Sequence, residues 1–167
     1  MAAIDIGSAA TIREANYIYG KTLILVDNPA NLSGKITSVE LYFGEGQDGV
    51  GVKVGTFYGS GTDYTCRDYA NIGAVTGGSK QTFSGLNISV EAGDYIGIYY
   101  SGGKVRYDST GYAGVYEKTG DQFNTGQQTY VLRANETDSV YGEGEEVAAL
   151  GGKSANMAAK MISGKLI

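Results

Sequence analysis

Apolar and polar residues alternate along short stretches of this chain, and glycine-rich segments separate these stretches. Residues 35–43 show the pattern most regularly, with Val39, Leu41 and Phe43 on one face and Ser38, Glu40 and Tyr42 on the other. In a β-strand, successive side chains point to opposite faces of the sheet. This segment is therefore predicted to be a strand with one buried face.

The same signal recurs and predicts about ten short strands before residue 143, with no helical stretch between them. The predicted strands cover residues 22–27, 35–43, 50–58, 64–70, 80–86, 86–90, 95–100, 105–107, 112–117, 129–133 and 140–141. In the clearest unit, a strand ending at Val90 is followed by a turn at 91–94 and by a returning strand. Short strands with glycine-rich turns are typical of an all-β, antiparallel two-sheet sandwich, and we expect one of the jelly-roll type.

The 167 residues are enough for one domain, which we place at 1–146, followed by a tail at 147–167. The boundary lies at an acidic step, Glu143, Glu145 and Glu146, after which the chain becomes rich in Ala, Met and Lys. Ser154 is predicted to cap a short helix that Gly164 ends.

Such a helix would place Ala158, Met161 and Ile162 on one side. A helix of about ten residues is marginally stable alone in water, so it needs a surface to pack on. We therefore expect these three residues to mediate homo-oligomerisation.

Composition argues for a binding or structural role rather than catalysis. The chain has 27 glycines and 14 tyrosines but no histidine, no tryptophan and one cysteine. Without histidine, neither a Ser-His-Asp or Cys-His device nor a Cys/His zinc site can be built. We therefore expect no catalytic residues.

The net charge and the distribution of apolar residues limit the classes of partner that we expect. A net charge of -5 argues against nucleic acid and against an anionic membrane. The first residues lack the basic and apolar regions of a secretory signal, and no apolar run approaches the ~20 residues of a membrane helix. Cys66 has no partner for an intrachain disulfide, and we expect it to be a packed, unreactive thiol.

Residues 27–114 resemble a glycine-rich β domain found in predicted proteins of bacteriophages and environmental viruses. The resemblance rests on residues 28–40, 54–58, 72–83 and 90–98. It implies a virion appendage, which is a decoration protein, a fibre or a receptor-binding (adhesion) module, assembled in the host cytoplasm on a larger particle. The alternative location is extracellular or at a cell surface.

Tyrosine-rich surfaces suit carbohydrate recognition, because rings stack on sugar faces while polar side chains bind hydroxyls. The candidate ligand-binding residues are Tyr42, Tyr99, Tyr107 and Glu40. A carbohydrate-binding module is therefore the alternative function, although the same tyrosines would serve a protein interface. A filament subunit and a glycosidase using carboxylates such as Glu40, Asp68 and Asp108 are further alternatives.

No cofactor is expected other than a possible structural calcium ion. The glycine-containing loops at 45–49 and 91–94 carry Asp48 and Asp94 as candidate oxygen ligands. In the second loop the simpler interpretation is that Asp94 accepts backbone hydrogen bonds that tie the turn.

Overall fold

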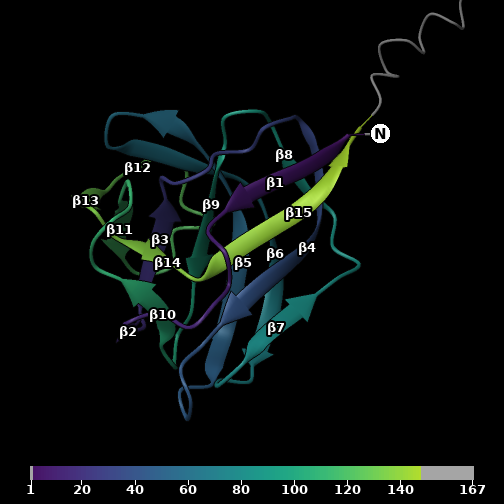
Figure 1. Ribbon diagram of the computed structural model, residues 1–167. Coiled ribbons are helices and arrows are strands. Elements are labelled where there is room, and N and C mark those ends of the chain that lie inside the picture. The colour runs from purple at the N-terminus through teal and green to yellow at the C-terminus, as the bar shows by residue number, and fades with distance from the viewer. Residues whose placement is uncertain (1, 148–167) are drawn as a thin grey trace, which may run out of the picture.

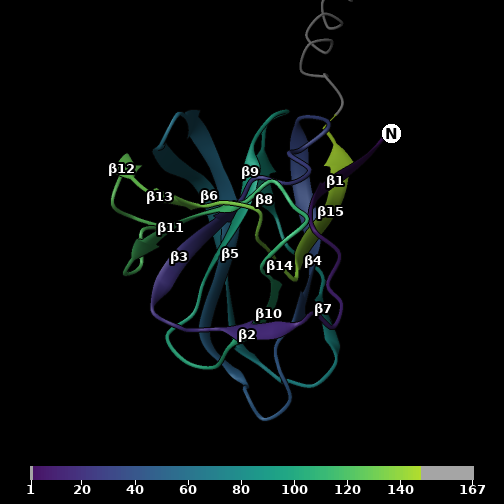
Figure 2. The ribbon, with the colours of Figure 1, turned by 60° about the vertical axis from the view of Figure 1, so that its left-hand side comes forward.

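The computed structural model describes residues 2–147, and within them the chain is all-β. The strands form three antiparallel sheets, named A, B and C here (Figures 1 and 2). The predicted all-β class with antiparallel sheets is confirmed. No helix among residues 2–147 has the length and apolar character needed to cross a membrane. The predicted C-terminal helix, with Ala158, Met161 and Ile162, lies outside the described residues.

Sheet A brings the two ends of the described chain together. Its strands are β1 (Ala3–Gly7), β4 (Gly34–Tyr42), β7 (Lys80–Phe83), β8 (Ile88–Val90) and β15 (Val140–Glu146). The order is β1-β15-β4-β7, and β8 also pairs with β4. Strand β15 therefore lies between β1 and β4, as Figure 1 shows.

Sheet C has seven strands and nearly closes on itself. They are β3 (Lys21–Leu25), β5 (Gly49–Ser60), β6 (Asp63–Val75), β9 (Tyr95–Tyr99), β11 (Val115–Thr119), β12 (Gln128–Thr129) and β13 (Val131–Arg133). The order is β12-β6-β5-β9-β3-β11-β13. The two outermost strands, β12 and β13, are separated in sequence by Tyr130 alone, so one short run of chain joins the two edges of the sheet.

Sheet B is small, and its strands β2 and β10 lie in the lower half of the molecule in Figure 2. Its strands are β2 (Ala15–Tyr17), β10 (Val105–Asp108) and β14 (Thr137–Asp138), in the order β14-β10-β2. A bridge between Phe43 and Val105 connects it to the end of β4. This connection places sheets A and B on either side of a shallow junction.

Sheets A and C enclose the main core between their inner faces. Val39, Leu41 and Phe43 are fully buried there, which confirms the alternation predicted for residues 35–43. From sheet C, Ile96 and Ile98 enter the same core. Burial of such side chains is the dominant favourable contribution to folding.

A second, aromatic cluster lies on the face of sheet C that is opposite the main core, called its outer face below. Its buried members are Ile24, Phe57, Tyr64, Phe123 and Tyr130. The rings fit because Gly55 and Gly97 oppose each other on β5 and β9 and leave a gap on that face. A Cβ atom at Gly97 would lie 2.5 Å from a ring carbon of Phe57. Cys66 packs against this cluster, and burial raises the pKa of its thiol to about 12, so the thiol stays protonated at neutral pH.

The unit predicted at residues 86–100 has the expected strands, but they do not pair with each other. β8 joins sheet A, while β9 joins sheet C between β5 and β3. The turn between them therefore crosses from one sheet to the other. Asp94 holds this turn, because its carboxylate accepts the backbone N–H of Glu91 at 2.9 Å and pairs with Arg67 of β6 at 2.6 Å.

Replacing Gly97 should force the ring of Phe57 out of its place. We expect Gly97→Ala to lower the free energy of unfolding by about 1–3 kcal/mol, as other overpacked sites do. Urea unfolding of Gly97→Ala, of Phe57→Leu and of the double variant Gly97→Ala/Phe57→Leu would measure the coupling energy between the two positions.

Leucine at position 57 is smaller than phenylalanine and leaves room for the methyl group that Gly97→Ala introduces. The free energy of unfolding of the double variant should therefore fall by less than the sum of the two single losses. Gly85→Ala is the control, since its Cβ would meet nothing within 4 Å and only its positive φ of 75° resists the change. Additive effects of Gly97→Ala and Phe57→Leu would contradict the packing argument.

Candidate functional site

A hollow of about 130 Å³ opens at the junction of sheets A and B. It is lined by Ile12, Tyr42, Glu45, Gly78 and Arg106. Pockets for drug-sized ligands usually measure about 300–1,000 Å³. This hollow is therefore smaller than such pockets and has room for one small protruding group.

Two glycine-containing turns form the base of the hollow. A Cβ atom at Gly77 would lie 2.0 Å from the carbonyl oxygen of Gly44, so the turns approach too closely for any larger residue there. The Asp48 carboxylate accepts the backbone N–H of Gly77 at 2.9 Å. The Tyr42 hydroxyl donates to the carbonyl oxygen of Gly78 at 3.1 Å, which fixes the ring at the wall of the hollow.

Arg106 of β10 supplies positive charge to the lining of the hollow. Its Nη1 donates to Asn16 Oδ1 at 2.9 Å and its Nη2 donates to the carbonyl oxygen of Arg13. Its Nε is buried and has no hydrogen-bond partner among the described residues. Arg106 and Glu45 thus place opposite charges around an aromatic ring.

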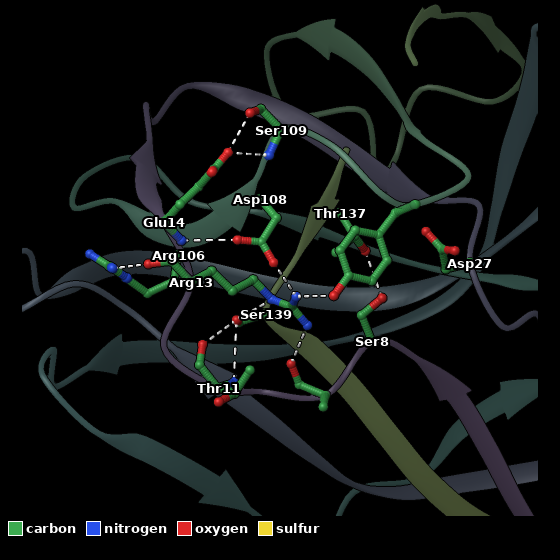
Figure 3. A network of polar contacts seen from close by, with 12 residues as sticks. Ser8, Thr11, Arg13, Glu14, Asp27, Arg106, Asp108, Ser109, Thr137 and Ser139 are labelled. Carbon is green, nitrogen blue, oxygen red and sulfur yellow. Dashed lines mark hydrogen bonds and ion pairs between the residues drawn. The ribbon is translucent and has the colours of Figure 1, made fainter. Parts of the chain in front are cut away.

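The segment that carries Ile12 is held by the buried guanidinium of Arg13 (Figure 3). Arg13 is 7% exposed. Its nitrogens donate to Ser139 Oγ at 2.8 Å, Asp108 Oδ2 at 2.8 Å, the Tyr112 hydroxyl at 3.1 Å and the carbonyl oxygen of Ala9 at 2.7 Å. These hydrogen bonds fix the chain segment at the rim of the hollow. Ile12, in this segment, is 67% exposed.

The four predicted ligand-binding residues do not form one site. Tyr42 and Glu40 share the outer face of β4, but only Tyr42 lines the hollow. Glu40 lies 3.7 Å from the Nζ of Lys80. Tyr107, on β10, packs edge-on against Tyr17 with 5.1 Å between ring centroids, and its ring contacts the main core.

Tyr99 lies in a different polar cluster, on the outer face of sheet C. Lys53 is opposite Tyr99 across β5 and β9, and its Nζ pairs with Asp121 at 2.5 Å and lies 5.4 Å from the ring centroid of Tyr69. Asn124 donates to the Tyr69 hydroxyl at 2.9 Å. This cluster combines tyrosine rings with amide and carboxylate groups, the combination expected for sugar recognition.

The carboxylates considered for calcium are both used in hydrogen bonds. Asp48 ties the turn at Gly77, and Asp94 is 3% exposed and bound by both Arg67 and the backbone of Glu91. The alternative interpretation of Asp94 as a residue that ties its turn is confirmed. Within residues 2–147, no three His, Cys, Asp or Glu side chains lie together in a way that could hold a metal ion. Calcium binding at either loop stays a prediction.

The carboxylates considered for glycoside hydrolysis lie in three different sheets. Glu40 belongs to sheet A, Asp68 to sheet C and Asp108 to sheet B. Asp68 accepts the backbone N–H groups of Tyr69 and Ser89, and Asp108 belongs to the Arg13 network.

Sequence reasoning missed Ile12, Arg13 and Arg106. Residue 12 lies in no periodic stretch. Arg106 belongs to a predicted strand, but the sequence does not indicate which residues its side chain would contact. The paired glycines at 77–78 were the one available signal, because they mark a place where two backbone segments approach closely.

The buried Asp138 lies beneath this region, opposite Tyr107 in the β10–β14 pairing. Burial, and then the charge of Glu136, raise its pKa to about 8, and Glu117 acts in the same direction. Arg13 and Arg133 lower the pKa but do not compensate for the burial. Its Oδ2 has no hydrogen-bond partner among the described residues.

Removing the Arg13 guanidinium should unfold the rim and weaken the whole domain. Arg13→Met leaves Asp108 and Ser139 without their partner, and we expect a loss of about 2–4 kcal/mol in the free energy of unfolding. Urea unfolding measures this loss. Lys104→Met, at a half-buried lysine outside every ion pair of the described residues, is the control and should cost far less. Equal free energies of unfolding for Arg13→Met and Lys104→Met would contradict the proposal that Arg13 stabilises the rim.

Asp138 should make stability fall as pH rises. The unfolded chain releases this proton near pH 4, whereas the folded protein keeps it to about pH 8, so stability present at low pH is lost across that window. Asp138→Asn removes the titration and should flatten the curve between pH 5 and 8. Free energies of unfolding of both proteins at several pH values test this, and parallel curves would show that Asp138 ionises normally.

Comparison of the chain with protein-family models, with curated proteins and with solved structures found no match. The resemblance to virion appendage domains therefore stays a prediction, and function has to be argued from the hollow and the surfaces around it.

Proposed function

We propose that this protein is a non-enzymatic contact module, a virion decoration or receptor-binding (adhesion) subunit that assembles as a homo-oligomer. The observation that carries the proposal is the hollow at Tyr42. It offers an aromatic ring, an exposed apolar side chain and opposite charges in a space for one protruding group. Sites of this kind recognise part of a larger molecule.

A role without turnover is supported by the chemistry of the side chains. The chain has no histidine, and its lone thiol has a raised pKa. Asp68, Asp94 and Asp108 are each held by two or more hydrogen bonds in the described structure.

The placement on a virion rests on the resemblance of residues 27–114. A jelly-roll arrangement of the sheets belongs to the same proposal, and the crossing between β8 and β9 is compatible with it. Assembly through Ala158, Met161 and Ile162 is likewise proposed from the sequence.

A carbohydrate-binding module is the second candidate, favoured by the cluster of Tyr69, Tyr99, Lys53, Asp121 and Asn124. Here the ligand would lie on the outer face of sheet C rather than at the hollow. The two candidates therefore predict sensitivity to different substitutions.

Binding of the labelled protein to glycan panels and to bacterial cells tests the choice between these surfaces. For the hollow, we expect Tyr42→Ala and Ile12→Ser to weaken binding about tenfold or more, which corresponds to about 1.4 kcal/mol. Tyr42→Phe keeps the ring and should bind nearly as the unchanged protein does. Tyr19→Ala, at a tyrosine 51% exposed elsewhere, is the matched control.

Loss of binding on Tyr99→Ala with no effect at Tyr42 would favour the carbohydrate module. Binding that neither change affects would rule out both surfaces. Sedimentation and electron microscopy of the same material test assembly separately, and a monomer at all concentrations would contradict the homo-oligomer.

A further inference from the structure

The outer face of sheet A is strongly acidic. It carries Asp5 from β1, Glu143 and Glu145 from β15, and Glu40 from β4. These strands lie side by side, with β15 in the middle (Figure 1). Asp5 lies directly opposite Glu143 in the pairing of β1 with β15. Like charges at opposed positions of a sheet are destabilising, so the fold keeps an arrangement that costs stability.

The described residues do little to neutralise this face. Among these acids only Glu40 forms an ion pair with a described residue, Lys80 at 3.7 Å. Lys35, opposite Glu145, donates instead to Ser89 Oγ at 2.9 Å. The half-buried Tyr141 lies within the group, and burial and then Asp5, Glu143 and Glu40 raise the pKa of its hydroxyl to about 12.

The chain that follows β15 has the opposite charge. Residues 148–167 contain Lys153, Lys160 and Lys165 and no acidic residue. Lys153 comes six residues after Val147, which allows a reach of about 20 Å. Gly151 and Gly152 precede it and permit a reversal of the chain.

We propose that residues 148–167 dock on the acidic outer face of sheet A of the same molecule, with their lysines paired to Asp5, Glu40, Glu143 and Glu145. Exposed ion pairs are individually weak. A short tether, however, holds the segment at an effective concentration in the millimolar range, which favours the same molecule over a neighbour. The docking should accordingly weaken as salt is added. It does not depend on the proposed function at the hollow. It uses the lysines of the segment and not Ala158, Met161 and Ile162, which stay available for the proposed contact between copies.

Zero-length carbodiimide cross-linking of the full chain tests this docking, because the reagent joins a carboxylate to an amine in direct contact. At low salt we expect cross-links from Lys153, Lys160 and Lys165 to Glu143, Glu145, Asp5 or Glu40. They should be lost near 1 M salt, where screening acts over about 3 Å. A mixture of light and heavy-isotope protein distinguishes links within one molecule from links between two.

Charge-neutral variants give the matched comparison. Glu143→Gln/Glu145→Gln should abolish most of these cross-links, while Glu14→Gln/Glu45→Gln, at exposed acids outside the strands of sheet A, should leave them unchanged. Cross-links formed equally with Glu14 and Glu45, or insensitive to salt, would overturn the proposal. Links that join light and heavy chains would also overturn it and would place a second copy on the face.

Discussion

The buried guanidinium of Arg13 is the interaction on which the candidate site depends. An unpaired charge buried to this degree would cost several kcal/mol, so its acceptors must all be in place at once. Those acceptors come from the N-terminal segment, from β10 and from the link between β14 and β15. Satisfying one cation therefore fixes the relative positions of three distant chain segments. Two of them, the N-terminal segment and β10, bring Ile12 and Arg106 into the lining of the hollow.

Charge is unevenly distributed over the rest of the molecule. Near the hollow, Arg106 and Glu45 oppose each other at a small aromatic surface. On the outer face of sheet A, only Glu40 of the gathered acids forms an ion pair with a described residue, Lys80. The first arrangement suits recognition of one polar group, and the second suits a segment bearing several positive charges. The two surfaces therefore have different requirements for a partner.

Local periodicity in the sequence predicted the strands and their buried faces well. The alternation of Val39, Leu41 and Phe43 was confirmed because a side chain's face depends only on its position along its own strand. Pairing depends on distant segments, and so the separate sheets of β8 and β9 were not predictable from residues 86–100. β1 and β2 were missed because each has too few large apolar side chains to establish a period of two, Ile4 and Ile6 in β1 and Tyr17 in β2. Their partners also lie about 90 to 140 residues away. Of the candidate ligand residues, only Tyr42 lies at the hollow, since convergence of side chains is set by that pairing.

The central place of β15 in sheet A has a consequence for biosynthesis. Ile4 and Ile6 of β1 belong to the core, yet β1 pairs only with a strand made some 135 residues later. Until the ribosome has delivered that strand, β1 and β4 each present an open edge that another nascent chain could occupy. Folds dominated by such distant contacts form slowly and are prone to misassembly. This chain is thus expected to complete its fold only after β15 has left the ribosome, with a yield that falls as expression rate rises.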